Sequence, residues 1–253
     1  MKGGARNWVT MWAGVLLLWF GLALMGSGAE EAGVERVEFE GVKLRVVRVE
    51  AKQVSLVWQG KEGGPLRTFG AVRKALVAEG RMPKLLMNAG IFEPGGIPSG
   101  LHVEKGKELR PVNVQKGEGN FFLEPNGVLE WTAKGARISE SKAWAAVKRE
   151  ALPEFALQSG PLLVLGGRIH PAFNAGSPNV KHRNGVGVDA EGRLVFAITN
   201  SNQVINFHTF ARLFRDELGC QDALFLDGDI SQMAGEPEEG VESNWFGAVL
   251  VVE

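Results

Sequence analysis

Hydrophobic and polar positions alternate along much of the chain, which is the pattern of strands that bury one face. The alternation is clearest over residues 34–49, and further strands are expected at 53–58, 84–87, 101–103, 120–123, 128–131, 156–159, 162–165, 185–189, 194–199, 223–226 and 246–252. Pro125-Asn126-Gly127 stands between two of these stretches and is a strong hairpin signal.

Three stretches have apolar residues at helical spacing instead. They are 69–79, which Gly80 ends, 139–150, with Ser139 or Ser141 as N-cap, and 207–218. Hairpin-linked strands dominate and the helices follow no regular βαβ rhythm. We therefore expect an α+β fold of one domain, with a mostly antiparallel or mixed β-sheet and about three flanking helices.

The first residues of the chain have the layout of a secretory signal peptide. Lys2 and Arg6 precede an apolar run at 11–25, and Ser27-Gly28-Ala29 supplies the small residues of a cleavage site. We expect a signal peptide at 1–29 and export to the periplasm, the cell envelope or the medium.

The folded domain is then expected at 30–253, with no stable membrane span after cleavage. The alternative is an uncleaved membrane anchor over residues 8–25, which is at the short end of lengths that cross a bilayer.

Composition narrows the partners and the chemistry. With 28 basic and 29 acidic residues and a formal charge of −1, the chain has no basic field, so no nucleic acid is expected as partner. The single cysteine, Cys220, excludes an internal disulfide and a cysteine-based zinc cluster. Neither a phosphate-binding glycine loop nor a zinc-hydrolase histidine spacing occurs. The sequence leaves the oligomeric state open.

Polar residues concentrate directly after apolar strands. The junctions are Asn88, Gln158-Ser159, Asn200-Ser201-Asn202, and Asp227 to Ser231. Strand ends that open into glycine-rich loops are where rigid scaffolds present catalytic groups. Each junction taken alone is also compatible with a simple turn. Four of them in one domain favour a site.

Arg183 lies in a basic turn that follows a long loop. A guanidinium group matches phosphate or carboxylate in a bidentate geometry, so Arg183 is a candidate anion ligand. The alternative is a solvated surface turn.

Six motifs occur in one order along the chain: NAGIF (88–92), GNFFLEPNG (119–127), QSGPLLV (158–164), RNGVGV (183–188), INFHTFARLFRDELGC (205–220) and ALFLDGDIS (223–231). This order resembles the phosphodiester glycosidase domain family, over roughly residues 34–252. The family includes the enzyme that removes N-acetylglucosamine from a phosphodiester to expose mannose 6-phosphate. This chain is most similar to the family's exported bacterial members.

The resemblance implies an exported hydrolase that cleaves the sugar–phosphate linkage of a glycosyl phosphodiester, of the N-acetylglucosamine-1-phosphodiester type. Its substrate would be a sugar phosphate or phosphoglycan. Asp227 would be the essential carboxylate, as general base, nucleophile or metal ligand, and Arg183 would neutralise the leaving phosphate. The residues expected to bind the substrate are Asn88, Phe92, Gln158, Ser159, Asn184 and Ser231.

Several roles stay open at this point. Phe92 is either an aromatic platform for the sugar or a loop anchor in the core. The second acid is Asp229, Glu93 or Glu104, and Asp229 stands where the family commonly has a glycine. Asp227 and Asp229 also suit a divalent cation such as calcium.

Two other functions compete with the hydrolase. The same polar cluster would serve a non-catalytic glycan- or phosphoglycan-binding module of the cell envelope. An interaction protein whose polar junctions are only turns is the third interpretation.

Overall fold

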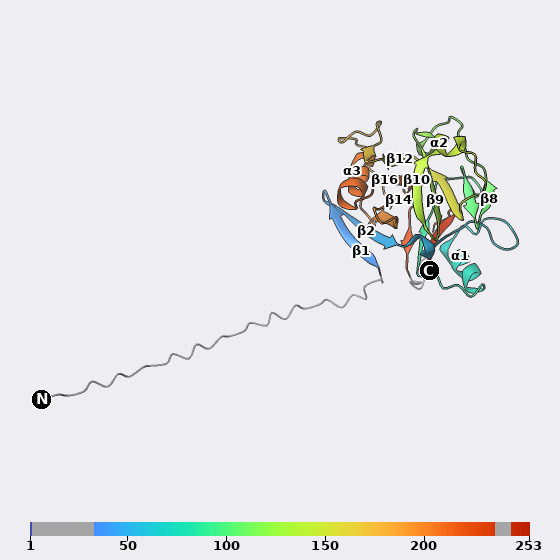
Figure 1. Ribbon diagram of the computed structural model, residues 1–253, viewed down its shortest axis with the longest axis horizontal. Helices are drawn as coiled ribbons and strands as arrows, with labels where there is room; N and C mark the ends of the chain where they lie inside the picture. Colours follow the sequence, from blue (N-terminus) through green and yellow to red (C-terminus); the bar gives the residue numbers. More distant parts are fainter. Residues whose placement is uncertain (2–32, 236–243) are drawn as a thin grey trace. The chain divides into compact units, whose positions relative to one another are not determined.

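The computed structural model describes residue 1 and residues 33–235 and 244–253, as the coloured ribbon in Figure 1 shows. The expected signal peptide at 1–29 lies outside the described residues. Within the part that is described, no helix is long and apolar enough to cross a membrane.

The largest sheet has seven strands, and every neighbouring pair in it is antiparallel. In spatial order the strands are β1 (Val34–Phe39), β2 (Val42–Val49), β15 (Leu194–Thr199), β14 (Asn184–Val188), β16 (Asp222–Asp227), β12 (Leu162–Leu165) and β13 (Arg168–Ile169). The strands expected at 34–49 are therefore one hairpin at the edge of this sheet.

Two smaller antiparallel sheets and a short hairpin contain the other strands found in residues 33–235 and 244–253. The five-stranded sheet has the order β10 (Gly135–Glu140), β9 (Gly127–Thr132), β11 (Phe155–Ser159), β7 (His102–Glu104) and β8 (Lys107–Arg110). The four-stranded sheet has the order β17 (Met233–Ala234), β4 (Leu85–Asn88), β18 (Val249–Val252) and β3 (Val54–Val57). The hairpin consists of β5 (Phe92–Glu93) and β6 (Ile97–Pro98).

The helices are α1 (Phe69–Val77), α2 (Ser141–Ala146) and α3 (Phe207–Arg212), and a π-helical turn over Leu213–Glu217 extends α3. These elements confirm the α+β class and the expected place of each helix. Helix α2 is shorter than the 139–150 predicted, because residues up to Glu140 pair with β9 as part of β10.

The strand predicted at 120–123 is wrong. Asn120–Phe122 forms a 3-10 turn, and the rings of Phe121 and Phe122 meet edge to face with centroids 5.0 Å apart. Successive side chains of a strand point to opposite faces, so two neighbouring rings in contact require a turn. Apolar content alone does not distinguish the two.

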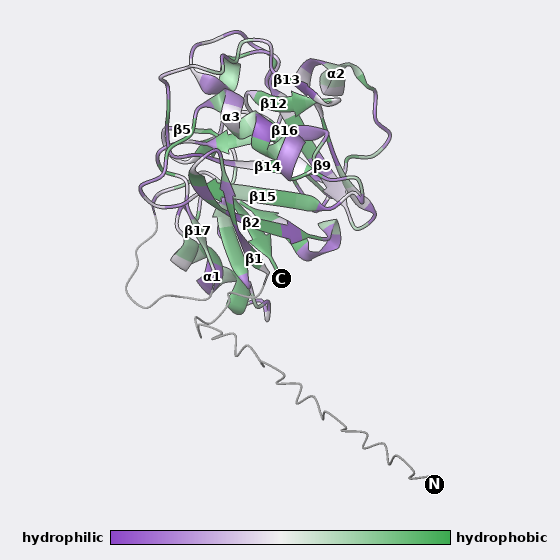
Figure 2. Ribbon diagram, turned by 90° about the vertical axis from the view of Figure 1, so that its left-hand side faces the viewer, coloured by the Kyte–Doolittle hydropathy of each residue, from purple (hydrophilic) through white to green (hydrophobic). Residues whose placement is uncertain are grey.

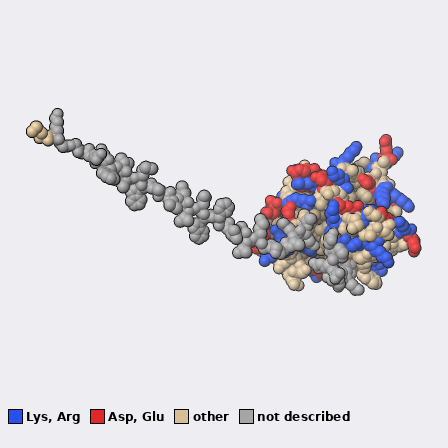
Figure 3. Space-filling view, turned by 90° about the horizontal axis from the view of Figure 1, so that it is seen from below, with Lys and Arg blue, Asp and Glu red and all other residues tan. Residues whose placement is uncertain are grey.

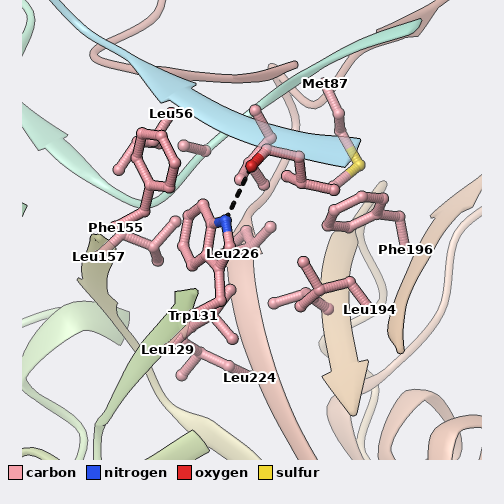
Figure 4. Close-up of a cluster of buried hydrophobic side chains, with 14 of the residues drawn as sticks. Leu56, Met87, Leu129, Trp131, Phe155, Leu157, Leu194, Phe196, Leu224 and Leu226 are labelled. Carbon is pink, nitrogen blue, oxygen red and sulfur yellow. Dashed lines mark hydrogen bonds between the residues drawn. The ribbon is translucent and has the colours of Figure 1, made fainter. Parts of the chain in front are cut away.

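The main core lies where the three sheets face one another. Figure 4 shows Leu56, Met87, Trp131, Phe155 and Phe196 meeting there from different strands. The indole of Trp131, which is 1% exposed, donates a hydrogen bond of 2.9 Å from Nε1 to the carbonyl of Val54. This bond joins the five-stranded sheet to the start of β3. In Figure 2 the central strands are correspondingly hydrophobic, whereas the connecting loops carry much of the polar colour.

Helix α3 covers the opposite face of the seven-stranded sheet (Figure 1). Two glycines of β14 allow this close approach. A Cβ atom at Gly187 would lie 2.6 Å from the Cys220 sulfur, and one at Gly185 would lie 3.1 Å from the Phe210 ring. Lys and Arg side chains are interspersed with Asp and Glu on the face in Figure 3, in keeping with the near-zero net charge.

We expect Trp131→Phe to lower the free energy of unfolding by about 1–3 kcal/mol, because it leaves the buried Val54 carbonyl without its indole partner. Urea unfolding measures this change. The exposed side chain of Val147 offers a control, since Val147→Ala should stay within about 0.5 kcal/mol of wild type. Equal stabilities of Trp131→Phe and wild type would contradict the role given to this hydrogen bond.

Candidate active site

A cluster of polar side chains forms where strands of two sheets end side by side. Asn88 is the last residue of β4, Asp227 is the last residue of β16, and Asn184 is the first residue of β14. Since β14 and β16 are antiparallel, Asn184 pairs with Asp227 in the ladder. A register shift separates this pair from the Gly185–Phe225 pair, and it lies at the point where the cluster begins.

The fully buried amide of Asn184 is the centre of the cluster. Its Nδ2 donates to both the carbonyl and the Oδ1 of Asn88, at 3.0 Å each. Its Oδ1 accepts from the Asp227 backbone N–H at 2.8 Å and from the Ser231 hydroxyl at 3.1 Å. All the hydrogen-bonding capacity of this amide is therefore used within the protein.

The side chain of Asn88 has only one orientation that satisfies its neighbours. Its Oδ1 accepts from Asn184 Nδ2 and from the Gln232 backbone N–H, the latter at 2.8 Å. Its Nδ2 is then directed at Asp227, 3.4 Å from Oδ2. Asn88 thus presents an N–H group to the carboxylate, and Asn184 holds it there.

The Asp227 carboxyl group is half-buried and has few donors of its own. Its Oδ1 accepts from the Gly228 backbone N–H at 2.7 Å. Burial, together with a smaller effect of the Asp229 charge, raises the pKa of Asp227 to about 6 even though the hydrogen bonds from Gly228 and Asn88 act to lower it. A carboxyl group with a pKa in this range exchanges its proton near neutral pH, which is typical of groups that act as acids or bases.

Ser159 supports the cluster through hydrogen bonds to the backbone next to it. Its buried hydroxyl donates to the Leu226 carbonyl at 3.1 Å and accepts from the Ile91 backbone N–H at 3.3 Å. It therefore joins the residue before Asp227 to the loop after Asn88. A Cβ atom at Gly90 would lie 2.9 Å from that of Ser159, so this contact requires the glycine of the NAGIF motif.

Gln158 lies in a different set of contacts, and the structure does not bring it to the carboxylate. Its Oε1 accepts from the backbone N–H groups of Leu101 and Asn113, at 3.1 and 2.8 Å. Its Nε2 donates to the Asn113 carbonyl at 2.6 Å and to the Ser141 hydroxyl at 3.1 Å. With all four positions occupied, Gln158 holds the 99–113 segment in place.

Arg183 is 1% exposed, and its guanidinium group lies among aromatic rings. The group is 3.7 Å from the centroid of Phe207 and 5.4 Å from that of Phe225. Nε donates to the Ile205 carbonyl at 2.9 Å, and Nη2 donates to the Asn179 carbonyl at 3.3 Å. Burial lowers the pKa of Arg183 to about 10, and the nearby charge of Asp229 raises it. The group therefore stays cationic at neutral pH.

No carboxylate among residues 33–235 and 244–253 forms an ion pair with Arg183, and no partner of its Nη1 is found among those residues. A buried cation without a counter-ion is costly, so an anion bound here would be stabilised. The charge of Asp229 acts on Arg183, but the Asp229 carboxylate is itself exposed and pairs with Lys181 at 2.9 Å.

His182 is a functional candidate that sequence reasoning did not assign. The Ser231 carbonyl, 3.0 Å from Nε2, can only accept a hydrogen bond, so Nε2 is the protonated nitrogen and donates to it. Nδ1 then accepts from the Thr199 hydroxyl at 2.7 Å. The imidazole thus joins Ser231, in the loop that follows Asp227, to Thr199 at the end of β15. Its signal in the sequence was only its place next to Arg183.

The remaining predicted residues lie further from the carboxylate. Phe92 is half-buried in β5 and packs against Gly247, where a Cβ atom would lie 2.6 Å from its own. Glu93 accepts from the Ser99 hydroxyl at 2.8 Å, and Glu104 accepts from the Trp58 N–H at 2.8 Å. Of the three candidate second acids, Asp229 is the one whose charge acts on Asp227.

The two aspartates do not form a cradle for a cation. The Asp227 oxygens face N–H donors of Gly228 and Asn88, and Asp229 pairs with a lysine. No group of three His, Cys, Asp or Glu side chains converges in the part of the chain that the structure describes. The Asp227 and Asp229 carboxylates, with these partners, therefore do not fit a calcium site.

The class of protein follows from the similarity of this chain to a known family. Residues 83–240 match the model of the phosphodiester glycosidase family, and the chain belongs to that family. It is 33% identical over 192 residues to the uncharacterized protein YigE of Escherichia coli K12, a match that covers 76% of this chain and 73% of that protein.

A solved structure shares the fold. The catalytic domain of zebrafish N-acetylglucosamine-1-phosphodiester alpha-N-acetylglucosaminidase, auto-inhibited by its pro-peptide, superimposes with a TM-score of 0.59. The match covers 87% of this chain and 81% of that chain, at 16% identity.

We expect Asp227→Asn to make the folded protein relatively more stable as the pH rises. The pKa of Asp227 is about 6 in the fold against the ordinary aspartate value of 3.8, which applies to the unfolded chain, so the folded state alone binds the proton between these values. The stability contributed by this proton is complete below pH 3.8 and is lost as the pH rises through 6.

The asparagine cannot ionise, so its unfolding free energy relative to wild type should increase by up to about 3 kcal/mol between pH 4 and pH 8. Urea unfolding at each pH unit measures this difference. A difference that is constant with pH would contradict the burial of an ionised Asp227.

Proposed function

We propose that the protein is an exported hydrolase that cleaves the sugar–phosphate linkage of a glycosyl phosphodiester, of the N-acetylglucosamine-1-phosphodiester type. The observation that carries the proposal is the Asp227 carboxyl group, whose pKa is raised to about 6 and whose position Asn88 and Asn184 fix. Family membership supplies the class of bond. The signal-like segment at 1–29 supports export.

The role that suits Asp227 best is that of a general base for the attacking water. A base works best when its pKa is near the working pH, and burial brings Asp227 toward that range. Asn88 contributes an N–H group that stabilises the carboxylate after the proton leaves. A direct attack by Asp227 on the sugar is the alternative course and would give a covalent intermediate.

Arg183 suits the leaving phosphate. Cleavage of the sugar–oxygen bond leaves negative charge on the phosphate, and a cation near it lowers the barrier. The guanidinium is held by the Ile205 and Asn179 carbonyls and by the Phe207 ring, and an anion that reaches this buried cation would be stabilised. Asp229 is our candidate for the second acid because its charge acts on both Asp227 and Arg183.

Asn88, Asn184 and Ser231 are proposed to orient the carboxylate and its loop, because all three are buried and their side chains bind one another and the backbone of that loop. Ser159 and Gln158 are proposed as positioning residues, because backbone groups and one neighbouring hydroxyl occupy their polar atoms. Their loss would act through the shape of the site.

We expect the purified protein to release free N-acetylglucosamine from an N-acetylglucosamine-1-phosphodiester, and Asp227→Asn to lower kcat by about 10²-fold or more, since it removes the base. Chromatographic assay of the released sugar measures both rates. Asp222→Asn is the matched control, because Asp222 begins the same strand that Asp227 ends, and kcat should be unchanged. Binding of the diester without any turnover by wild type would favour the glycan-binding module.

The value of kcat/KM should rise with pH up to about 6 and then level off, because a general base acts only when it is ionised and the pKa of Asp227 is about 6. Initial rates between pH 4 and pH 8 in buffers of constant ionic strength give this profile. A profile that instead falls as the pH rises through 6 would assign Asp227 the role of general acid.

A further inference from the structure

The largest aromatic side chain left exposed near the candidate site is that of Trp245, at 62% of its surface. Among the large apolar side chains that are exposed in the described part of the chain, it is the only aromatic one. A single exposed apolar residue is ordinary and does not by itself indicate a ligand. Its position, its support and its chemistry carry the inference.

On one side, the backbone around Trp245 is bonded to the segment that follows Asp227, at Ile230 and Gln232. Asn244 donates from its Nδ2 to the Ile230 carbonyl at 2.9 Å, and its N–H donates to Gln232 Oε1 at 3.0 Å. The N–H of Gln232 in turn binds the Oδ1 of Asn88 at 2.8 Å. Trp245 is thus connected to the Asp227–Asn88 pair through two side chains.

The other side of the segment is tied to the loop before α1. The Phe246 N–H donates to the Arg67 carbonyl at 2.7 Å, and Gly247 packs directly against Phe92. These contacts hold the backbone of residues 244–247 on both sides. The backbone that carries the indole is therefore held in place next to the loop that follows Asp227.

Arg67 covers one face of the indole. Its guanidinium carbon is 4.3 Å from the ring centroid, and the backbone of Arg67 has the unusual φ of 67°. Its Nε is buried without a hydrogen-bond partner among the described residues. Because the cation occupies one face, the exposed surface of Trp245 comprises the opposite face and the ring edges.

We infer that Trp245 and Arg67 form a pyranose-binding subsite adjoining the Asp227 cluster. This inference rests on the proposed function for the identity of the substrate. A flat indole with one open face stacks on the C–H face of a sugar ring, and the Arg67 guanidinium packed on the other face holds the indole in place. Trp245 then fills the role of aromatic platform that the sequence suggested for Phe92, which supports Trp245 through Gly247.

The ring bound there is either the released sugar or a sugar on the alcohol side of the phosphate, and two substrates distinguish them. Methyl N-acetylglucosamine-1-phosphate contains only the released ring, whereas the corresponding diester with the primary hydroxyl of a hexose contains both. We expect Trp245→Ala to raise KM about tenfold for each substrate that contains the ring bound by Trp245. The value of kcat should stay within about threefold of wild type.

An increase for both substrates places the released sugar on Trp245, and an increase for the hexose diester alone places the alcohol part there. Trp245→Phe should recover most of the loss because it restores a stacking face. Met82→Ala is the control, since Met82 is also exposed, at 71%, and is not connected to the cluster. Unchanged KM values for both substrates in Trp245→Ala would overturn the inference while leaving the hydrolase proposal intact.

A binding measurement separates this inference from the hydrolase proposal. Saturation-transfer NMR with free N-acetylglucosamine and with the hexose, on wild-type and Trp245→Ala protein, needs no turnover. Transfer to either sugar that Trp245→Ala abolishes supports the subsite even if no diester is cleaved. Equal transfer to both proteins, or no transfer to wild type, would overturn it. Equal urea midpoints of the two proteins verify that the substitution leaves the fold intact.

Discussion

The site depends on one side-chain amide. Asn184 donates to Asn88 and accepts from both Asp227 and Ser231, and these residues come from three strands and a loop of two sheets. A buried amide with all four positions satisfied has one orientation, because any rotation leaves a donor facing a donor. The geometry around the carboxylate therefore follows from the way β4 and β14 meet, and the site is only as well ordered as that junction.

The cluster also explains the unusual proton affinity of Asp227. The Asn88 Oδ1 accepts from Asn184 and Gln232, which fixes the orientation of the amide. Its Nδ2 therefore donates to the carboxylate, in one long hydrogen bond of 3.4 Å. Gly228 supplies the other, and the two do not fully replace the water that burial removes. Arg183 adds no ion pair to Asp227, since its guanidinium lies among Phe207, Phe225 and backbone carbonyls. The positive and the negative group of the proposed mechanism therefore have separate sets of partners within the protein.

Much of the fold could be predicted from the sequence, because alternation and helical spacing are local signals. The strands of the seven-stranded sheet other than β13 and the places of the three helices follow from them, whereas β13, the turn at Asn120–Phe122 and strand β10 do not. Phe121 and Phe122 read as strand residues until their ring contact is known. The order of strands in the sheets depends on contacts between distant residues and has no comparable local signal.

The candidate site was partly predictable for the same reason. Asn88 and Asp227 stand at strand ends, and a strand end is visible in a sequence, so their convergence was a reasonable expectation. The contacts of Gln158 with the 99–113 segment, the bridging role of His182 and the exposure of Trp245 depend on which partners surround each side chain. Residue type and spacing contain little of that information.

The geometry of the site also depends on the two glycines of β14 that lie beneath α3. Gly185 follows Asn184 directly, and a methyl group there would press on the Leu224 carbonyl and on the Phe210 and Phe214 rings. Relatives could therefore retain every polar residue of the cluster and still lose its geometry through a change on the far face of the sheet. A survey of homologues for retained function should accordingly examine the small residues under α3 together with the polar ones, because the helix and the site share a single strand.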